Sequence, residues 1–484
     1  MLKSLRKEGL SLKSKCVQNT SEVDGTVTVH GENLVGSSLQ VKWANCNICI
    51  EESNQCNCDH IKVEDIKNIV AEGDSVDTKL DTHEEATSSF AHAVINMVGM
   101  LIGLGQLSTP YAIEKGGWAS SFMLIGLGVM CAYTSYLLGK CLHKNPKLRS
   151  YVDIGDQAFG AKGRFLVATF IYMEIFMALV SYTISLHDNL IKVFLGTHLK
   201  MHLAKLSTSQ ILTMLAILIA LPSLWIRDLS SISFLSSGGI LMSLLIFFSV
   251  VATAIFGGVQ ANHSIHALHI HNFPSISGLY VFGYGGHIVF PNLYKAMKDP
   301  SKFTKVSIVS FTVVTTLYTT MGFMGAKMFG NDVKSQITLS MPPKKIVTKI
   351  ALWATVLTPM TKYALELAPL AIQLEHKLPS SMNGRIKMLI RGCIGSILLL
   401  LILTLALSVP YFEHVLSLTG SLVSVAISLI MPCVFYVKIC WGQMPKSLFV
   451  LNLFLITFGL LLGMMGTFSS SKLLVENLIT HYSS

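Results

Sequence analysis

Long apolar runs fill the chain from residue 89 onward, whereas the first 88 residues are mostly polar. A helix needs about 20 apolar residues to cross the hydrocarbon layer of a membrane. Runs of that length recur after residue 89, and short polar connections separate them. The pattern predicts eleven membrane-spanning helices, at residues 89–113, 117–139, 163–186, 207–226, 231–257, 274–296, 304–327, 347–372, 389–408, 411–437 and 447–469.

The composition supports a membrane protein with several spans. Only 13% of the 484 residues are charged and 51% are hydrophobic, whereas soluble proteins carry about 25% charged residues. The polar segment has too few apolar residues for a core, so we expect a mostly disordered tail at 1–88 and a membrane domain at 89–472. The net charge of +10 fits basic loops beside a membrane, and nucleic-acid binding is not expected.

Lysine and arginine are distributed unevenly between the predicted loops, and they are more frequent in the loops on the side of the N-terminus. Because cytosolic loops carry an excess of these residues, we expect a cytosolic N-terminus and, after eleven crossings, a lumenal C-terminus. The lumenal loop 262–272 contains four histidines, which would gain charge in an acidic compartment. This loop could sense pH, or it could be a solvated connector.

The first and sixth predicted spans contain residues that interrupt helices. These residues are Gly99, Gly103, Gly105 and Pro110 in the first span, and Gly283, Gly285, Gly286 and Pro291 in the sixth. One interruption alone could serve helix packing or a kink. The two interruptions correspond in position if spans one to five and six to ten are repeats, and we therefore expect them to form a binding site.

The backbone groups that an interruption frees indicate the kind of ligand. In hydrocarbon an unpaired backbone polar group is costly, so an unwound segment survives only beside a cavity or a ligand. One new helix end presents amide groups that attract a carboxylate, and the other presents carbonyl groups that attract an ammonium group. Such a site suits a zwitterion. The candidate binding residues are Asn96, Gly99, Gly103, Gly105, Gln106, Ser108, Phe282, Gly283, Tyr284, Gly285, Gly286 and His287.

Two ionisable residues lie deep inside predicted spans. Glu174 stands about eleven residues into the third span, and His287 stands at the break of the sixth. A buried carboxyl group without a counter-charge binds a proton more readily, and imidazole exchanges protons near neutral pH. Both are candidates for proton coupling. Alternatively, Glu174 bonds a neighbouring helix and His287 caps the freed backbone.

The tail contains cysteines and a histidine with partial zinc-site spacing. The residues are Cys46, Cys49, Cys56, Cys58 and His60. The first pair has the spacing of a zinc knuckle, whereas the Cys-x-Cys pair is not the common pattern. Zinc binding and simple reduced thiols are both open.

Several segments resemble the amino acid/auxin permease family. The segment GLGQLSTPYA at 103–112 is similar to the first-span signature of that family. Three further segments are similar to its plant vacuolar amino acid transporter group, at 151–155, 282–300 and 358–365. Gln106 departs from the family, which usually has an aliphatic residue there.

The resemblance implies an all-α membrane fold of the leucine-transporter type with eleven spans and interrupted first and sixth spans. Its inverted repeats would cover 89–257 and 274–437, with an extra span at 447–469. In the eighth span, Lys362 and Glu366 are four residues apart and could form an ion pair. Alternatively, the Lys362 ammonium group replaces the sodium ion of sodium-coupled relatives, with oxygens from two nearby threonines, Thr358 and Thr361.

The resemblance also implies a function: secondary active transport of neutral amino acids across an endomembrane of the vacuolar type, coupled to or exchanging with protons. The expected partners are an amino acid, protons and the lipid bilayer. We see no Walker loop, HExxH motif or nucleophile elbow, so we expect neither an enzyme nor a cofactor. An auxin-like or sodium-coupled carrier, an ion channel and a non-transporting amino acid sensor are the alternatives.

Overall fold

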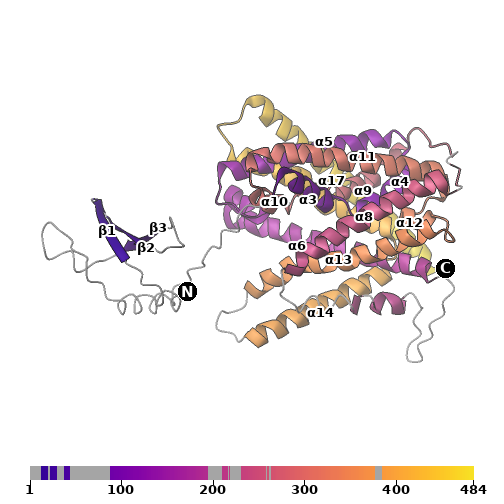
Figure 1. Ribbon diagram of the computed structural model, residues 1–484. Helices are drawn as coiled ribbons and strands as arrows, with labels where there is room; N and C mark the ends of the chain where they lie inside the picture. Colours follow the sequence, from indigo (N-terminus) through magenta and orange to yellow (C-terminus); the bar gives the residue numbers. More distant parts are fainter. Residues whose placement is uncertain are drawn as a thin grey trace. The chain divides into compact units, whose positions relative to one another are not determined.

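The computed structural model describes residues 12–19, 22–29, 38–43, 88–194, 210–215, 217–218, 230–257, 259–260, 263–376 and 384–483. The chain divides into two compact units, Met1–His83 and Glu84–Ser484 (Figure 1). The proposed zinc ligands, Cys46 to His60, lie outside the described residues.

The N-terminal unit contains a three-stranded antiparallel sheet. Its strands are β1 (Leu12–Asn19), β2 (Glu22–Val29) and β3 (Ser38–Trp43), in the order β1-β2-β3. Leu12 pairs with Val29 and Val23 pairs with Trp43. The β-branched residues of β2, which reads EVDGTVTV, favour a strand. These strands lie within the predicted tail, so the all-α prediction applies to the second unit only.

The second unit is a bundle of helices (Figure 1). The helices are α3 (Phe90–Leu101), α4 (Leu104–Gly116), α5 (Ser120–Lys144), α6 (Tyr151–Val193), α8 (Ser230–Phe256), α9 (Phe273–Gly283), α10 (Phe290–Ala296), α11 (Phe303–Phe329), α12 (Ile337–Ser340), α13 (Ile346–His376), α14 (Gly384–Ser408), α15 (Phe412–Thr419), α16 (Met431–Ile439) and α17 (Lys446–Ser483). Short 3₁₀ turns are η2 (Ile270–Asn272), η3 (Pro300–Lys302) and η4 (Gly330–Asp332), and π-helical turns are η5 (Gly420–Ser424) and η6 (Ala426–Ile430).

Within the described residues, six helical segments are long and apolar enough to cross a membrane, and the bent pair α3–α4 would make a seventh. The expected sixth span is divided into α9 and α10, each too short to span alone. Most of the expected fourth span, 207–226, lies outside the described residues. The total of eleven spans and the inverted repeat therefore stay predictions, whereas both predicted interruptions are present.

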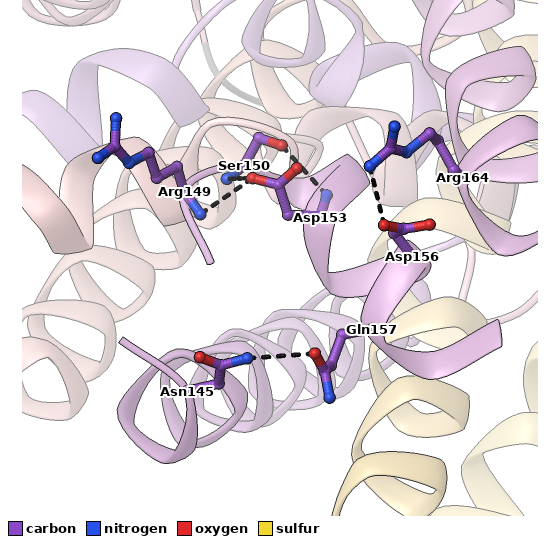
Figure 2. Close-up of polar contacts among 7 residues, drawn as sticks. All are labelled: Asn145, Arg149, Ser150, Asp153, Asp156, Gln157 and Arg164. Carbon is purple, nitrogen blue, oxygen red and sulfur yellow. Dashed lines mark hydrogen bonds and ion pairs between the residues drawn. The ribbon is translucent and has the colours of Figure 1, made fainter. Parts of the chain in front are cut away.

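Helix α6 begins at Tyr151, earlier than the predicted start of the third span at residue 163. Ser150 and Asp153 form a reciprocal capping box that starts the helix, as such a pair satisfies the first free amide groups. The helix bends at Gly160, whose φ is 62°, a value that glycine tolerates best. Across the bend, the Arg164 guanidinium group lies 2.8 Å from the Asp156 carboxylate (Figure 2).

The surface and core of the second unit match a membrane environment. Helix α17 exposes many apolar side chains, including Phe468, which is 74% exposed. Such a face suits lipid better than water. The core contains α9, which packs against α4, α15, α17 and the π-helical turn η5. The interrupted segments therefore lie among other helices.

Candidate functional site

The first interruption is short. Helix α3 ends at Leu101 and α4 begins at Leu104, and the two helices are bent by 59°. The amide of Ile102 still donates to the carbonyl of Val98, and the backbone of Gly103 is extended. The first amides of α4 have no acceptor inside their own helix. The Gln106 amide, in the first turn of α4, donates to the Gly103 carbonyl at 3.2 Å. The break therefore lies between the carbonyl end of α3 and the amide end of α4.

The second interruption is longer and covers residues 284–289 between α9 and α10. The amide of Gly285 donates to the carbonyl of Phe282 at 3.0 Å, and the amide of Val289 donates to the carbonyl of Gly286 at 3.0 Å. These bonds form turns and do not continue a helix. Part of the freed backbone is thus satisfied locally.

The two interruptions meet at Gly105 and Gly283. A Cβ atom added to Gly105 would lie 2.4 Å from the Cα of Gly283, so only glycine fits there. The hydroxyl of Tyr318, from α11, lies 2.8 Å from the Leu101 carbonyl and 3.0 Å from the Gly283 carbonyl. Leu101 and Gly283 are the last residues of α3 and α9. One hydroxyl therefore bridges the two helix ends.

Part of the residues at the two breaks is accessible. Four residues at the breaks are partly accessible, although many of their neighbours in the chain are buried: Gly103, Phe282, Gly285 and Gly286. The hydroxyl of Tyr182 lies 3.5 Å from a Cβ atom built on Gly103. Accessible backbone at a helix break, inside a bundle, is the arrangement expected for a ligand site.

Glu174 lies at the second break. Its Oε1 accepts a hydrogen bond of 2.9 Å from the Ser424 hydroxyl. The same Oε1 lies 3.3 Å from a Cβ atom built on Gly285. The residue as a whole is partly buried. The structure therefore brings this residue of the third span to the break of the sixth.

His287 is fully buried and faces α5. Its Nε2 lies 3.1 Å from the Cys131 carbonyl and 3.0 Å from the Thr134 hydroxyl. A carbonyl only accepts, so Nε2 carries the ring proton and Nδ1 is an acceptor in the neutral ring. Nδ1 has no hydrogen-bond partner in the part of the chain that the structure describes, and the ring contacts Phe290 at a centroid distance of 4.8 Å. Within the described residues, His287 anchors the break to α5 and does not cap its backbone.

The other predicted binding residues differ in their surroundings. A Cβ atom on Gly99 would lie 2.3 Å from Ile240, so this glycine permits close packing of α3 on α8. The Ser108 hydroxyl donates to the Gly105 carbonyl at 3.1 Å. Tyr284 is buried, and its hydroxyl donates to the Leu124 carbonyl at 3.2 Å. These residues contact neighbouring helices or their own helix and so stabilise the segments around the breaks.

Gln106 and Asn96 complete the predicted set. Gln106 is fully buried, and its Nε2 donates to the Ser243 carbonyl of α8 at 3.0 Å. No described residue forms a hydrogen bond with its Oε1. Asn96 lies in α3 and is partly buried. The side-chain amide of Gln106 thus links the first interrupted span to α8.

The predicted cation site lies on α13. The Thr361 hydroxyl donates to the Thr358 carbonyl at 2.8 Å, and the Thr358 hydroxyl donates within its own helix. A Cβ atom on Gly239 would lie 3.8 Å from the Lys362 Cε, so α8 leaves room for the lysine. Lys362 and Glu366 interact electrostatically across one helical turn. Both interpretations of this pair stay predictions.

The histidine loop packs on the end of the first interrupted span. The amides of Trp118 and Ala119 donate to the carbonyls of His266 and Ala267, both at 3.0 Å. Gly117 has a φ of 81°, and a Cβ atom there would clash with this loop.

Within the described residues, no group of three or more His, Cys, Asp or Glu side chains could hold a metal ion.

Sequence reasoning missed Tyr318 and Ser424. Both are hydroxyl-bearing residues within apolar spans, and such residues often bond their own helix. Their contacts join residues far apart in the chain, because Tyr318 reaches Leu101 and Ser424 reaches Glu174. No local sequence signal distinguishes them from their neighbours.

Comparison with known proteins identifies the family. Residues 86–471 match the family model described as transmembrane amino acid transporter protein. The chain is 60% identical over 437 residues to amino acid transporter AVT1H of Arabidopsis thaliana, covering 90% of this chain and 98% of that protein. It is 38% identical to amino acid transporter AVT1E of the same plant, covering 82% of this chain and 75% of that protein.

The fold also resembles that of a solved transporter. A Na⁺-coupled sialic acid symporter aligns with a TM-score of 0.50 and 12% identity, covering 78% of this chain and 87% of that one. This similarity concerns the fold alone. Because the matching family model and the plant relatives are described as amino acid transporters, the prediction that the chain is not an enzyme is confirmed. The chain belongs to the transmembrane amino acid transporter family.

Proposed function

We propose that the protein is a secondary active transporter that moves neutral amino acids, coupled to protons, across a vacuole-type endomembrane. The observation that carries the proposal is the meeting of the two interruptions at Gly105 and Gly283, beside the carboxyl group of Glu174. Two broken helices that meet offer backbone groups of both polarities in one place.

The backbone groups suit an amino acid. The amide end of α4, at Leu104 and Gly105, would bind the substrate carboxylate, because a helix N-terminus attracts negative charge. The carbonyl end of α9, at Gly283, would bind the ammonium group. The accessible surfaces of Gly103, Gly285 and Gly286 would let the substrate backbone approach closely.

A neutral substrate side chain follows from the charge at the site. Glu174 is the carboxyl group beside the break, and its oxygen lies close to Gly285. A proton on Glu174 would leave the occupied site without net charge, since a zwitterion is itself neutral. A neutral carrier reorients at lower cost than one with a bare charge in the membrane. The proton would therefore move with the amino acid.

Lys362 supports coupling to protons over coupling to sodium. Its side chain lies against Gly239 of α8, next to the hydroxyl of Thr361. An ammonium group held there would occupy the place of a coupling cation. The vacuolar location rests on the similarity of three sequence segments to the plant vacuolar group, and a cytosolic N-terminus rests on the lysine and arginine distribution.

Uptake by reconstituted vesicles tests the function. We expect labelled neutral amino acids to exchange or accumulate with a pH gradient, and an uncoupler to abolish accumulation. Accumulation driven by a sodium gradient without a pH gradient would favour the sodium-coupled alternative. Binding of amino acids without flux would favour a sensor.

A further inference from the structure

The residue that holds Glu174 belongs to an irregular part of the tenth span. Helices α15 and α16 are joined by the π-helical turns η5 (Gly420–Ser424) and η6 (Ala426–Ile430). Pro432 follows at the start of α16, and proline cannot donate the hydrogen bond of a regular helix to the residue four positions earlier. Such π-helical turns occur frequently at functional sites.

Serines follow one face of this span, but their hydroxyl groups behave differently. The Ser421 hydroxyl donates to the Ser417 carbonyl of its own helix at 2.8 Å. The Ser428 hydroxyl is buried and has no hydrogen-bond partner among the described residues. The Ser424 hydroxyl instead donates to a residue of another helix, the Glu174 carboxyl group of α6, at 2.9 Å. Ser424 is itself completely buried.

The surroundings of Glu174 make this hydrogen bond important. Within the described residues, the charged or titratable groups that interact with its carboxyl group are Glu366 of α13 and Tyr151 of α6. Neither is a cation, so neither neutralises a Glu174 carboxylate. Ser424 is then the hydrogen-bond donor from another helix that stabilises the charged form, because hydrogen bonds to ionised groups are stronger than those between neutral groups.

We infer that Ser424 is a positioning residue that holds the Glu174 carboxyl group beside Gly285 and sets the pH at which Glu174 releases its proton. The inference rests on the proposed role of Glu174 in proton coupling. It makes the tenth span part of the coupling mechanism, because any rotation of η5 would move the donor away from Glu174. Glu174 would then retain its proton more strongly.

The pH profile of uptake tests this inference. In Ser424→Ala we expect the pH of half-maximal uptake to rise by about one pH unit, since the lost donor stabilised the carboxylate over the acid. Ser424→Thr keeps a hydroxyl and should restore the wild-type profile. Ser428→Ala is the matched control, because it removes a buried hydroxyl without a partner, and its profile should equal that of the wild type.

Two results would overturn the inference. One is a wild-type profile in Ser424→Ala, and the other is an equal shift in Ser424→Ala and Ser428→Ala, which would indicate a general effect on the π-helical turns. If the Ser424→Ala protein does not accumulate in the membrane, Ser424→Cys provides a weaker hydrogen-bond donor. An unchanged pH profile of uptake in Ser424→Cys would also contradict the inference. Infrared difference spectra of the protonated carboxyl band provide a measurement that does not require flux, and we expect Ser424→Cys to alter that band.

Glu174→Gln separates this inference from the proposed function. Loss of pH dependence in Glu174→Gln, together with a wild-type profile in Ser424→Ala, would overturn only the role of Ser424. Wild-type pH dependence in Glu174→Gln would overturn proton coupling through Glu174 itself.

Discussion

The two interrupted spans both expose backbone groups at a helix break, but the structures of the two breaks differ. The first break is short, and α4 resumes at Leu104 without a side-chain cap. The second break covers residues 284–289, and His287 ties it to α5. The first break therefore supplies mainly backbone groups, whereas the second adds side chains and lies beside Glu174. In the function that we propose, the first break would bind substrate and the second would also couple binding to protons.

Replacing Gly105 with valine tests the contact between the breaks. A Cβ atom there would lie 2.4 Å from the Gly283 backbone, and overpacking by extra methylene groups typically costs about 1–3 kcal/mol. We expect uptake to fall about tenfold to a hundredfold, because the backbone of both breaks must shift. Gly126→Val is the control, since no atom of the described residues lies within 4 Å of a Cβ atom there. Normal uptake by Gly105→Val would refute the close contact.

Tyr318→Phe tests the bridge between the two helix ends. The change removes the hydroxyl that contacts the Leu101 and Gly283 carbonyls. A buried carbonyl without its donor costs about 1–3 kcal/mol, so we expect substrate affinity to fall about tenfold. Tyr294→Phe keeps the ring contact with Phe303 and should bind substrate normally. Equal affinities of the two variants would contradict a specific role for the bridge.

His287→Ala tests the anchor of the second break. It removes the hydrogen bond to the Cys131 carbonyl and the contact with Thr134. We expect affinity to weaken about threefold to tenfold, since the segment is no longer fixed against α5. Thr134→Val keeps the bond to the Cys131 carbonyl and should have a smaller effect. A larger effect of Thr134→Val, measured by equilibrium binding, would show that the anchor is described incorrectly.

Asp299→Asn should have the smallest effect on uptake, because Asp299 lies after α10 and outside both breaks. The Ser301 hydroxyl, with Lys302 nearby, lowers the pKa of the Asp299 carboxyl group. A lowered pKa in the folded state means that this local stabilisation is present above the ordinary Asp value of about 3.9 and is lost as pH falls further. We expect faster hydrogen exchange at the Ser301 amide in Asp299→Asn, with uptake changed less than about twofold. Unchanged exchange would exclude a capping role.

Much of the fold could be predicted from the sequence, because membrane insertion depends on local composition. Apolar length places most spans, and clustered glycines place both interruptions. The early start of α6 was missed because its capping box at Ser150 precedes the apolar run. The helix also continues across the bend at Gly160. The strands of the N-terminal unit were missed because a polar composition outweighed the β-branched residues of β2.

The sequence by itself determined that the chain enters a membrane, that the first and sixth spans are broken, and that Glu174 lies deep within a span. Each of these depends on residues that are neighbours along the chain. Only the tertiary structure decided that Gly105 meets Gly283, that Tyr318 bridges the two breaks, and that His287 faces α5. These contacts join residues from different spans, and the packing of whole helices, rather than any local pattern, determines which of their faces meet.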